Sequence, residues 1–134
     1  MSEKLCALRK IGGGGTLKET VLWTNPSPTS DFAYQTLTLN QSIDDFKKIA
    51  VYYRLSTANN SRESFVTYTT EEFKKFNIDS TNAVGAIGVR STTSWIRALF
   101  YTDSTHVAIG SCYTLSTTSM DNHYTIPTKI VGLK

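Results

Sequence analysis

Alternation of apolar and polar side chains with a period of two is the feature of this sequence that most restricts its fold. It is clearest in KIAVYYRLS, residues 48–56. Successive side chains of a β-strand point to opposite faces of a sheet. One face of this segment would hold Ile49, Val51, Tyr53 and Leu55, and the other Ala50, Tyr52, Arg54 and Ser56. The pattern predicts a strand with one buried face.

Similar segments recur along the chain. The turn-forming stretch TANNSRE is followed by SFVTYTT, so residues 47–70 are expected to form a β-hairpin. SWIRALFYT (94–102) and HVAIGSCYTLS (106–116) flank a turn at Asp103-Ser104 and predict a second hairpin. Further strands are expected at 20–24, 32–39, 83–90 and 128–133. About eight short, closely spaced strands predict an all-β fold, an antiparallel β-sandwich or jelly roll.

Helix is expected to be scarce. In TTEEFKKFN, Thr69 precedes Glu72 by three residues, which is the order of a capping box. QSIDDFKK offers one further turn, and the adjacent Asp44 and Asp45 suit turn formation better than paired acid–base work. At most one or two short helical turns are therefore predicted.

The run Gly12–Gly15 divides the chain. Glycine loses more backbone entropy on ordering than other residues do, so this run predicts a flexible joint. It is not followed by the Lys-Ser or Lys-Thr pair of a phosphate-binding loop. We expect residues 1–15 to be an N-terminal attachment segment and 16–134 a single domain.

Composition narrows the class of protein. The net charge of +3 is small and its basic residues are dispersed, which argues against a nucleic-acid groove. The 20 Thr and 14 Ser suit the exposed positions of sheets in extracellular and viral proteins. No run of 18 apolar residues predicts membrane insertion, and MSEKLCALRK lacks the apolar core of a signal peptide. Synthesis in the cytoplasm is expected.

Residues for catalysis or metal binding are few. Asp121 and His123 form an Asp-x-His pair, but a metal site needs a third ligand and usually a fourth. No serine lies in a Gly-x-Ser-x-Gly motif. Cys6 and Cys112 are expected to be buried or incidental thiols, with an oxidised pair as the alternative. We predict a protein that is not an enzyme and has no metal or cofactor.

Aromatic residues are the remaining side chains that could bind a ligand. Tyr and Trp combine an apolar ring with a polar tip, which suits stacking on sugars beside hydrogen-bonding groups. Most are expected in the core, and Trp23, at the end of a strand before two prolines, is expected to close the core at its edge. The aromatic residues that suit such a contact by type are Tyr34, Tyr52, Tyr68, Trp95 and Tyr124. The candidate ligand-binding residues are Tyr52, Arg54, Trp95 and Tyr124.

Three stretches resemble one protein family. They are ETVLWTNPSPTSDFAYQTLTL (19–39), DDFKKIAVYYRLS (44–56) and YTIPTKIVGLK (124–134). They are similar to the C-terminal β-sandwich modules of tail, baseplate and fibre proteins from phages and prophages of Gram-positive bacteria. The matching positions are Leu22–Asn25, Pro28, Gln35–Leu39, Ile49–Arg54 and Ile126–Lys134. These motifs are structural and not catalytic, and the resemblance covers most of residues 19–134.

The resemblance implies a virion protein at or near the distal tail that either contacts the host surface or holds neighbouring tail proteins together. Our first hypothesis is a non-enzymatic module that recognises saccharide on the host cell surface. Its implied partners are other virion proteins, host cell-wall polysaccharide and further copies of itself, with a trimer as the expected assembly. The alternative is a purely structural assembly protein, a capsid decoration protein or a head fibre. It is kept because such modules usually end much longer chains, whereas here only about a dozen residues precede the module's glycine run. A small glycan hydrolase is the third reading, disfavoured because no separated pair of acidic residues stands out.

Overall fold

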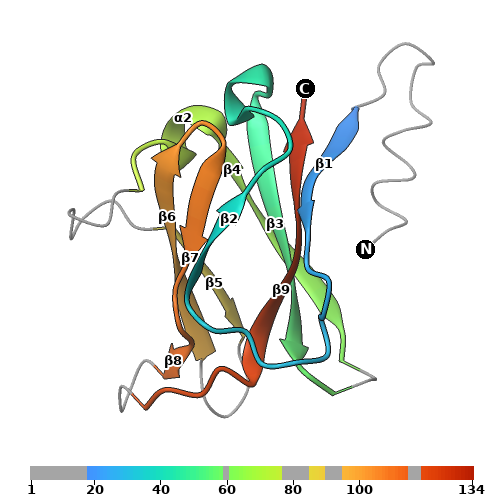
Figure 1. Cartoon of the computed structure of the whole chain (residues 1–134), viewed down its shortest axis with the longest axis vertical. Coiled ribbons are helices and arrows are strands. Elements are labelled where there is room, and N and C mark those ends of the chain that lie inside the picture. Colours follow the sequence, from blue (N-terminus) through green and yellow to red (C-terminus); the bar gives the residue numbers. More distant parts are fainter. Residues whose placement is uncertain (1–17, 59–60, 77–84, 90–94, 115–118) are drawn as a thin grey trace.

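Two antiparallel β-sheets lie face to face in the computed structural model, which describes residues 18–58, 61–76, 85–89, 95–114 and 119–134 (Figure 1). This confirms the predicted all-β sandwich. The first sheet, sheet A, has the order β1-β9-β3-β4. Its strands are β1 (Glu19–Thr24), β9 (Tyr124–Leu133), β3 (Lys48–Ser56) and β4 (Glu63–Thr69).

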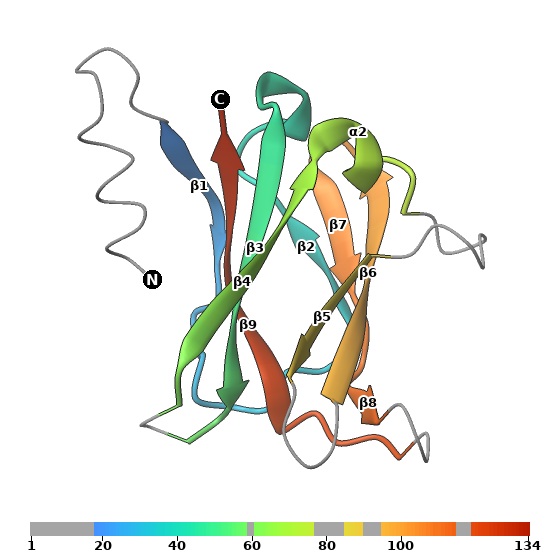
Figure 2. The same ribbon diagram turned by 180° about the vertical axis from the view of Figure 1, so that it is seen from behind.

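The second sheet, sheet B, has the order β2-β7-β6-β5, and the short β8 also pairs with β6. Its strands are β2 (Gln35–Thr38), β7 (His106–Ile109), β6 (Trp95–Asp103), β5 (Gly85–Val89) and β8 (Tyr113–Thr114). The two opposite views show the C-terminus and α2 at one end of the sandwich and β8 at the other (Figures 1 and 2). The predicted attachment segment, residues 1–15, lies outside the described residues.

The two predicted hairpins are present, with one change. β3 and β4 pair in register from Lys48 opposite Thr69 to Arg54 opposite Glu63. The predicted strand 106–116 is instead split into β7 and β8, because the chain leaves the ladder between Gly110 and Cys112.

Both predicted helical turns form. A 3-10 turn, η1, covers Ile43–Asp45, and a single α-helical turn, α2, covers Thr70–Phe73. The capping box is complete: the Thr69 hydroxyl accepts from the Glu72 N–H, and the Glu72 carboxylate accepts from the Thr69 N–H. These hydrogen bonds to Thr69 lower the pKa of Glu72 below its usual value.

The core lies between the sheets. Ile49, Val51 and Tyr53 are buried in it and Leu55 packs against it, as the alternation predicts. The largest fully buried side chains include Leu22, Phe73, Ile87, Leu99, Ile109, Ile126 and Ile130. Both sheets therefore contribute one apolar face to a shared interior.

A β-bulge in β1 directs Trp23 inward. Val21 pairs with Val131 but Trp23 pairs with Ile130, so Leu22 is the extra residue. Val21 is 45% exposed, while Leu22 is buried and Trp23 packs against the core with its ring edge-to-face with Phe32, centroids 6.1 Å apart. The predicted core role of Trp23 is confirmed, although Trp23 does not share a face with Val21 as simple alternation would require.

Gly132 lets Phe46 close one end of the interior. Gly132 lies in the middle strand of sheet A, paired with both Thr20 and Ile49. A Cβ atom added at Gly132 would lie 2.5 Å from the ring of Phe46. The close approach of this ring therefore requires glycine.

Arg97 is a charged residue at the centre of the core. Its side chain is 0% exposed. Among the described residues, the guanidinium donates hydrogen bonds to main-chain carbonyl oxygens: those of Thr125 (2.6 Å), Phe32 (2.7 Å), Gly110 (3.0 Å), Tyr124 (3.0 Å) and Asn122 (3.1 Å). One side chain therefore joins β6 to three separate connecting segments.

No salt bridge joins Arg97 to a carboxylate among the described residues; its charge meets oriented carbonyl dipoles and the ring of Phe32, 5.3 Å from the guanidinium carbon. Burial lowers the pKa of Arg97 to about 10, so the side chain stays protonated at neutral pH. A buried cation is costly unless its donors are satisfied, and here they are.

Replacing Gly132 by alanine is expected to destabilise the fold. The added methyl group must displace the Phe46 ring, and overpacking of this kind costs about 1–3 kcal/mol. Urea denaturation measures the loss. Gly110→Ala is the matched control, because a Cβ atom there is 3.6 Å from its nearest neighbour, an ordinary contact. Equal stability of the two variants would contradict the argument.

Replacing Arg97 by methionine is expected to cost about 3–5 kcal/mol, because it leaves buried carbonyl oxygens without donors. Arg97→Lys keeps the charge but has a smaller donor group, so we expect an intermediate loss. Thermal or urea unfolding provides the measurement, with Arg62→Met at an exposed position as control. A methionine variant as stable as the parent would show that Arg97 does not hold these segments.

Candidate functional site

A shallow groove of about 330 Å³ lies on the outer face of sheet B, where β7 gives way to β8. Its lining is mainly apolar and aromatic. The residues are Tyr34, Ile96, Ala98, Phe100, Gly110, Ser111, Tyr113 and Thr114. Three of these residues, Tyr34, Phe100 and Tyr113, are aromatic.

The strand register explains the shape of the groove. Ile96, Ala98 and Phe100 alternate with the inward Arg97 and Leu99, so they face outward. Ile96 pairs with Tyr113, and Phe100 pairs with Ala108. Between these rows, Gly110 donates its N–H to the carbonyl of Ala98 (2.9 Å). The two smallest residues thus form the floor, with larger side chains on either side.

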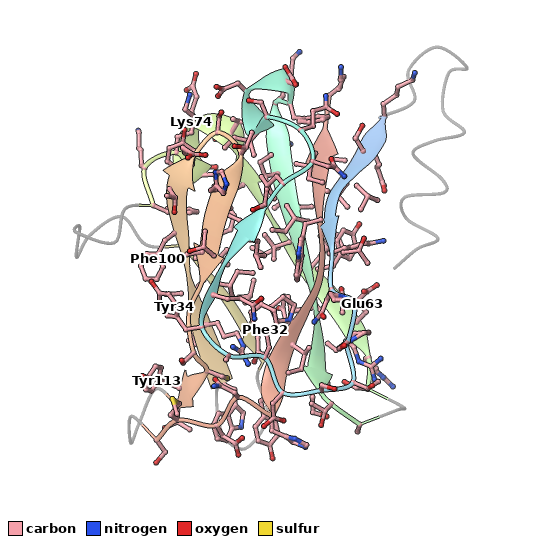
Figure 3. The ribbon with its side chains drawn as sticks, viewed as in Figure 1. Phe32, Tyr34, Glu63, Lys74, Phe100 and Tyr113 are labelled. Carbon is pink, nitrogen blue, oxygen red and sulfur yellow. The ribbon has the colours of Figure 1, made fainter. Side chains whose placement is uncertain are left out.

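Exposed aromatic rings form the walls. Tyr34 and Tyr113 are 48% and 47% exposed. The Tyr34 and Phe100 rings are 6.4 Å apart between centroids and tilted by 32°. Figure 3 shows Phe100, Tyr34 and Tyr113 one below another along the outer side of the sandwich, pointing away from Phe32 in the interior.

Arg97 supports the groove from the opposite face of the same sheet. Its guanidinium holds the carbonyl of Gly110 in the floor and that of Phe32, two residues before Tyr34. The N–H of Cys112 donates to the Asn122 side chain (2.9 Å), which fixes the chain just before Tyr113. These hydrogen bonds therefore fix the main chain between β7 and β8, and the shape of the groove depends on that fixed main chain.

Cys112 is the thiol beneath this break. It is buried and free, as predicted, and burial raises the pKa of its thiol. Cys6 lies outside the described residues. A buried thiol of raised pKa is a poor nucleophile, so Cys112 is structural.

The predicted candidates Tyr52 and Arg54 lie on the other sheet. The Tyr52 ring stacks on Phe65 with centroids 5.1 Å apart, and the ammonium of Lys129 lies 4.5 Å from the Tyr52 centroid. Arg54 is half-buried and donates to the carbonyl of Ala58 in the following turn. Neither residue reaches the groove.

The predicted candidates Trp95 and Tyr124 are brought together. Their rings stack 4.3 Å apart at an interplanar angle of 14°, and His123 meets Tyr124 edge-on. Trp95 packs against the core cluster, and both rings are half-buried. This pair closes the end of the core and offers less open ring surface than Tyr34 and Tyr113 do.

The Asp121–His123 pair forms a turn. The Asp121 carboxylate accepts from the main-chain N–H of His123 (3.0 Å), while the His123 ring contacts the Thr57 hydroxyl and Asp31. Within the described ranges no three His, Cys, Asp or Glu side chains gather as a metal site would require, and no helix there has the length and apolarity to span a membrane.

No protein-family model and no curated protein matches the chain.

Sequence reasoning missed most of the groove. The residue type of Tyr34 suits sugar binding, but Tyr34 is not among the predicted ligand-binding residues. Phe100 and Tyr113 are not among them either. The segment SWIRALFYT does contain a signal. Its residues Ile96, Ala98 and Phe100 share one face of the strand, and the small Ala98 lies between two large side chains. That signal becomes meaningful only once Gly110 is known to lie beside Ala98, which depends on tertiary structure.

Stability should separate the groove from the Trp95–Tyr124 pair. Trp95→Ala is expected to cost about 2–4 kcal/mol because it removes packing from the core, whereas Tyr113→Ala should change stability by less than about 0.5 kcal/mol. Urea unfolding of both variants tests this. A large loss for Tyr113→Ala would mean that its ring is structural.

Proposed function

We propose that the protein is a non-enzymatic virion module of the tail or fibre type that recognises saccharide on the host cell surface. The observation that carries the proposal is the outer groove of sheet B, with exposed Tyr34 and Tyr113 beside Phe100. Exposed aromatic rings around a cavity mark binding surfaces, because burying them against a ligand is favourable and holding them in water is not.

The chemistry of the groove suits sugars. A pyranose ring has an apolar face that stacks on aromatic rings and hydroxyls that need hydrogen-bond partners. The walls supply Tyr and Phe rings, and the rim supplies the hydroxyl of Ser111. The groove residues include no carboxylate, histidine or cysteine. Glycoside hydrolysis requires two carboxyl groups, so the groove suits binding and not hydrolysis.

The family resemblance supports the virion context. Its quoted segments include β1, β3 and β9, which are three adjacent strands of sheet A. The groove lies on sheet B, partly outside those segments. The same segments also contain β2 and Tyr34, so the resemblance extends to part of sheet B and of the groove. Several copies on one particle would multiply a weak contact through effective concentration, and a trimer is the assembly we propose.

A structural assembly role is the second candidate. The stacked Tyr52 and Phe65 lie on the outer face of sheet A, and Phe65 belongs to the edge strand β4. Phe65 and Val21 are both exposed on this sheet. These two side chains lie on β4 and β1, the opposite edges of sheet A, and exposed apolar side chains at sheet edges suit contact with other virion proteins.

Adsorption to cells tests the first candidate against the second. Fluorescent protein displayed in many copies on beads is expected to adsorb to susceptible Gram-positive cells and to be displaced by their purified wall polysaccharide. Each lost aromatic contact is worth about 0.5–1.5 kcal/mol, so Tyr34→Ala with Tyr113→Ala should weaken adsorption at least about fivefold. The control pair Tyr52→Ala with Phe65→Ala should retain it.

Adsorption lost in the control pair and kept in the groove pair would place the contact with the cell on sheet A and contradict the proposal. Absence of adsorption across a broad panel of Gram-positive cells, even in the bead format, would also contradict it.

A further inference from the structure

We infer that the groove takes an uncharged oligosaccharide segment lying along β6, and not an acidic glycan or a single sugar. This inference rests on the proposed function and specifies the ligand of the same site. Three observations support it: the charge of the lining, the length of the groove and the polar groups at its rim.

Among the residues that the structure describes, the lining carries no charged side chain. All eight residues are apolar, hydroxyl-bearing or glycine. The cation nearest in sequence to the groove floor is Arg97, next to Ala98, but it is fully buried on the inner face. Its donors are occupied by main-chain carbonyls, including that of Gly110 in the floor. An acidic sugar in this groove would lose hydration without gaining a cationic partner, which is unfavourable.

The length of the groove favours a chain of sugars. Phe100 and Ile96 lie at its two ends, four residues apart on one strand, which corresponds to about 13 Å. Tyr34 stands beside Phe100 at one end, and Tyr113 pairs with Ile96 at the other. An aromatic platform at each end is suited to successive rings of a short oligosaccharide, and a single ring reaches only one platform.

The floor and rim suit a flat, neutral ligand. Ala98 and Gly110 leave the floor low, so a ring can approach the main chain. The Tyr34 and Tyr113 side chains are exposed, so their hydroxyls lie at the rim. Together with Ser111 they are neutral donors and acceptors, which match sugar hydroxyls without requiring charge.

Titration of the whole protein with defined oligosaccharides tests the inference. The neutral probes are malto-, cello-, manno- and chito-oligosaccharides of one to six units, and the acidic probes are oligogalacturonates and hyaluronan fragments. Isothermal calorimetry, with ligand-observed NMR for weak binders, measures affinity. We expect binding of at least one neutral series, at least tenfold tighter for two or more units than for one, and at least tenfold weaker binding of the acidic series.

Two kinds of variant locate the binding. Ala98→Leu fills the floor from the outer face and should abolish binding while the circular dichroism spectrum and thermal midpoint stay close to the parent values. Tyr113→Ala should weaken binding of longer oligosaccharides more than that of monosaccharides. Tyr52→Ala, an aromatic loss on the opposite sheet, is the matched control and should bind as the parent does.

Each outcome decides between the claims. Acidic glycans that bind and are lost in Ala98→Leu would overturn the inference and leave the proposed function standing. Neutral binding that survives Ala98→Leu would overturn the assignment to this groove. Self-association of the protein that Ala98→Leu removes, without glycan binding, would overturn both in favour of a second copy as occupant. Binding of no glycan together with cell adsorption blocked by Ala98→Leu would also overturn the inference.

Discussion

The hydrogen bonds of Arg97 are the interaction on which the arrangement of this sandwich depends. The side chain projects from β6 into the core and is anchored to carbonyls before β2, after β7 and at the start of β9. A core of aliphatic side chains fixes distances between sheets but not the paths of connecting segments, because apolar contacts are not directional. Oriented donors supply that direction. Breaking them would leave buried acceptors unsatisfied, so the segments have little freedom to move.

This anchoring links the interior to the groove on the outer face of sheet B. Gly110 accepts from Arg97 with its carbonyl and donates to Ala98 with its N–H, so one residue belongs to both the buried network and the groove floor. Phe32 stacks edge-on against Trp23 inside, and Tyr34 faces outward two residues later. The position of each groove wall is therefore set by a buried contact close to it in sequence.

The strands could be predicted because alternation is a local property, as residues 48–56 demonstrate, and the capping box of Thr69 and Glu72 is equally local. The bulge at Leu22 and the split between β7 and β8 could not, because both depend on which residues lie across the ladder. The alternation along β6 places the Arg97 side chain on the same inward face as Trp95 and Leu99, yet the charge of an arginine predicts a surface position. Only the carbonyls of distant segments make its burial possible. The groove was missed for the same reason.

The small floor residues also have an evolutionary consequence. Ala98 and Gly110 face away from the core, and a Cβ atom at Gly110 meets only ordinary contacts. Side chains of different size at these two positions would reshape the groove while the buried network stays intact. Descendants of this protein can therefore change the shape of this surface by single substitutions that leave the scaffold sound.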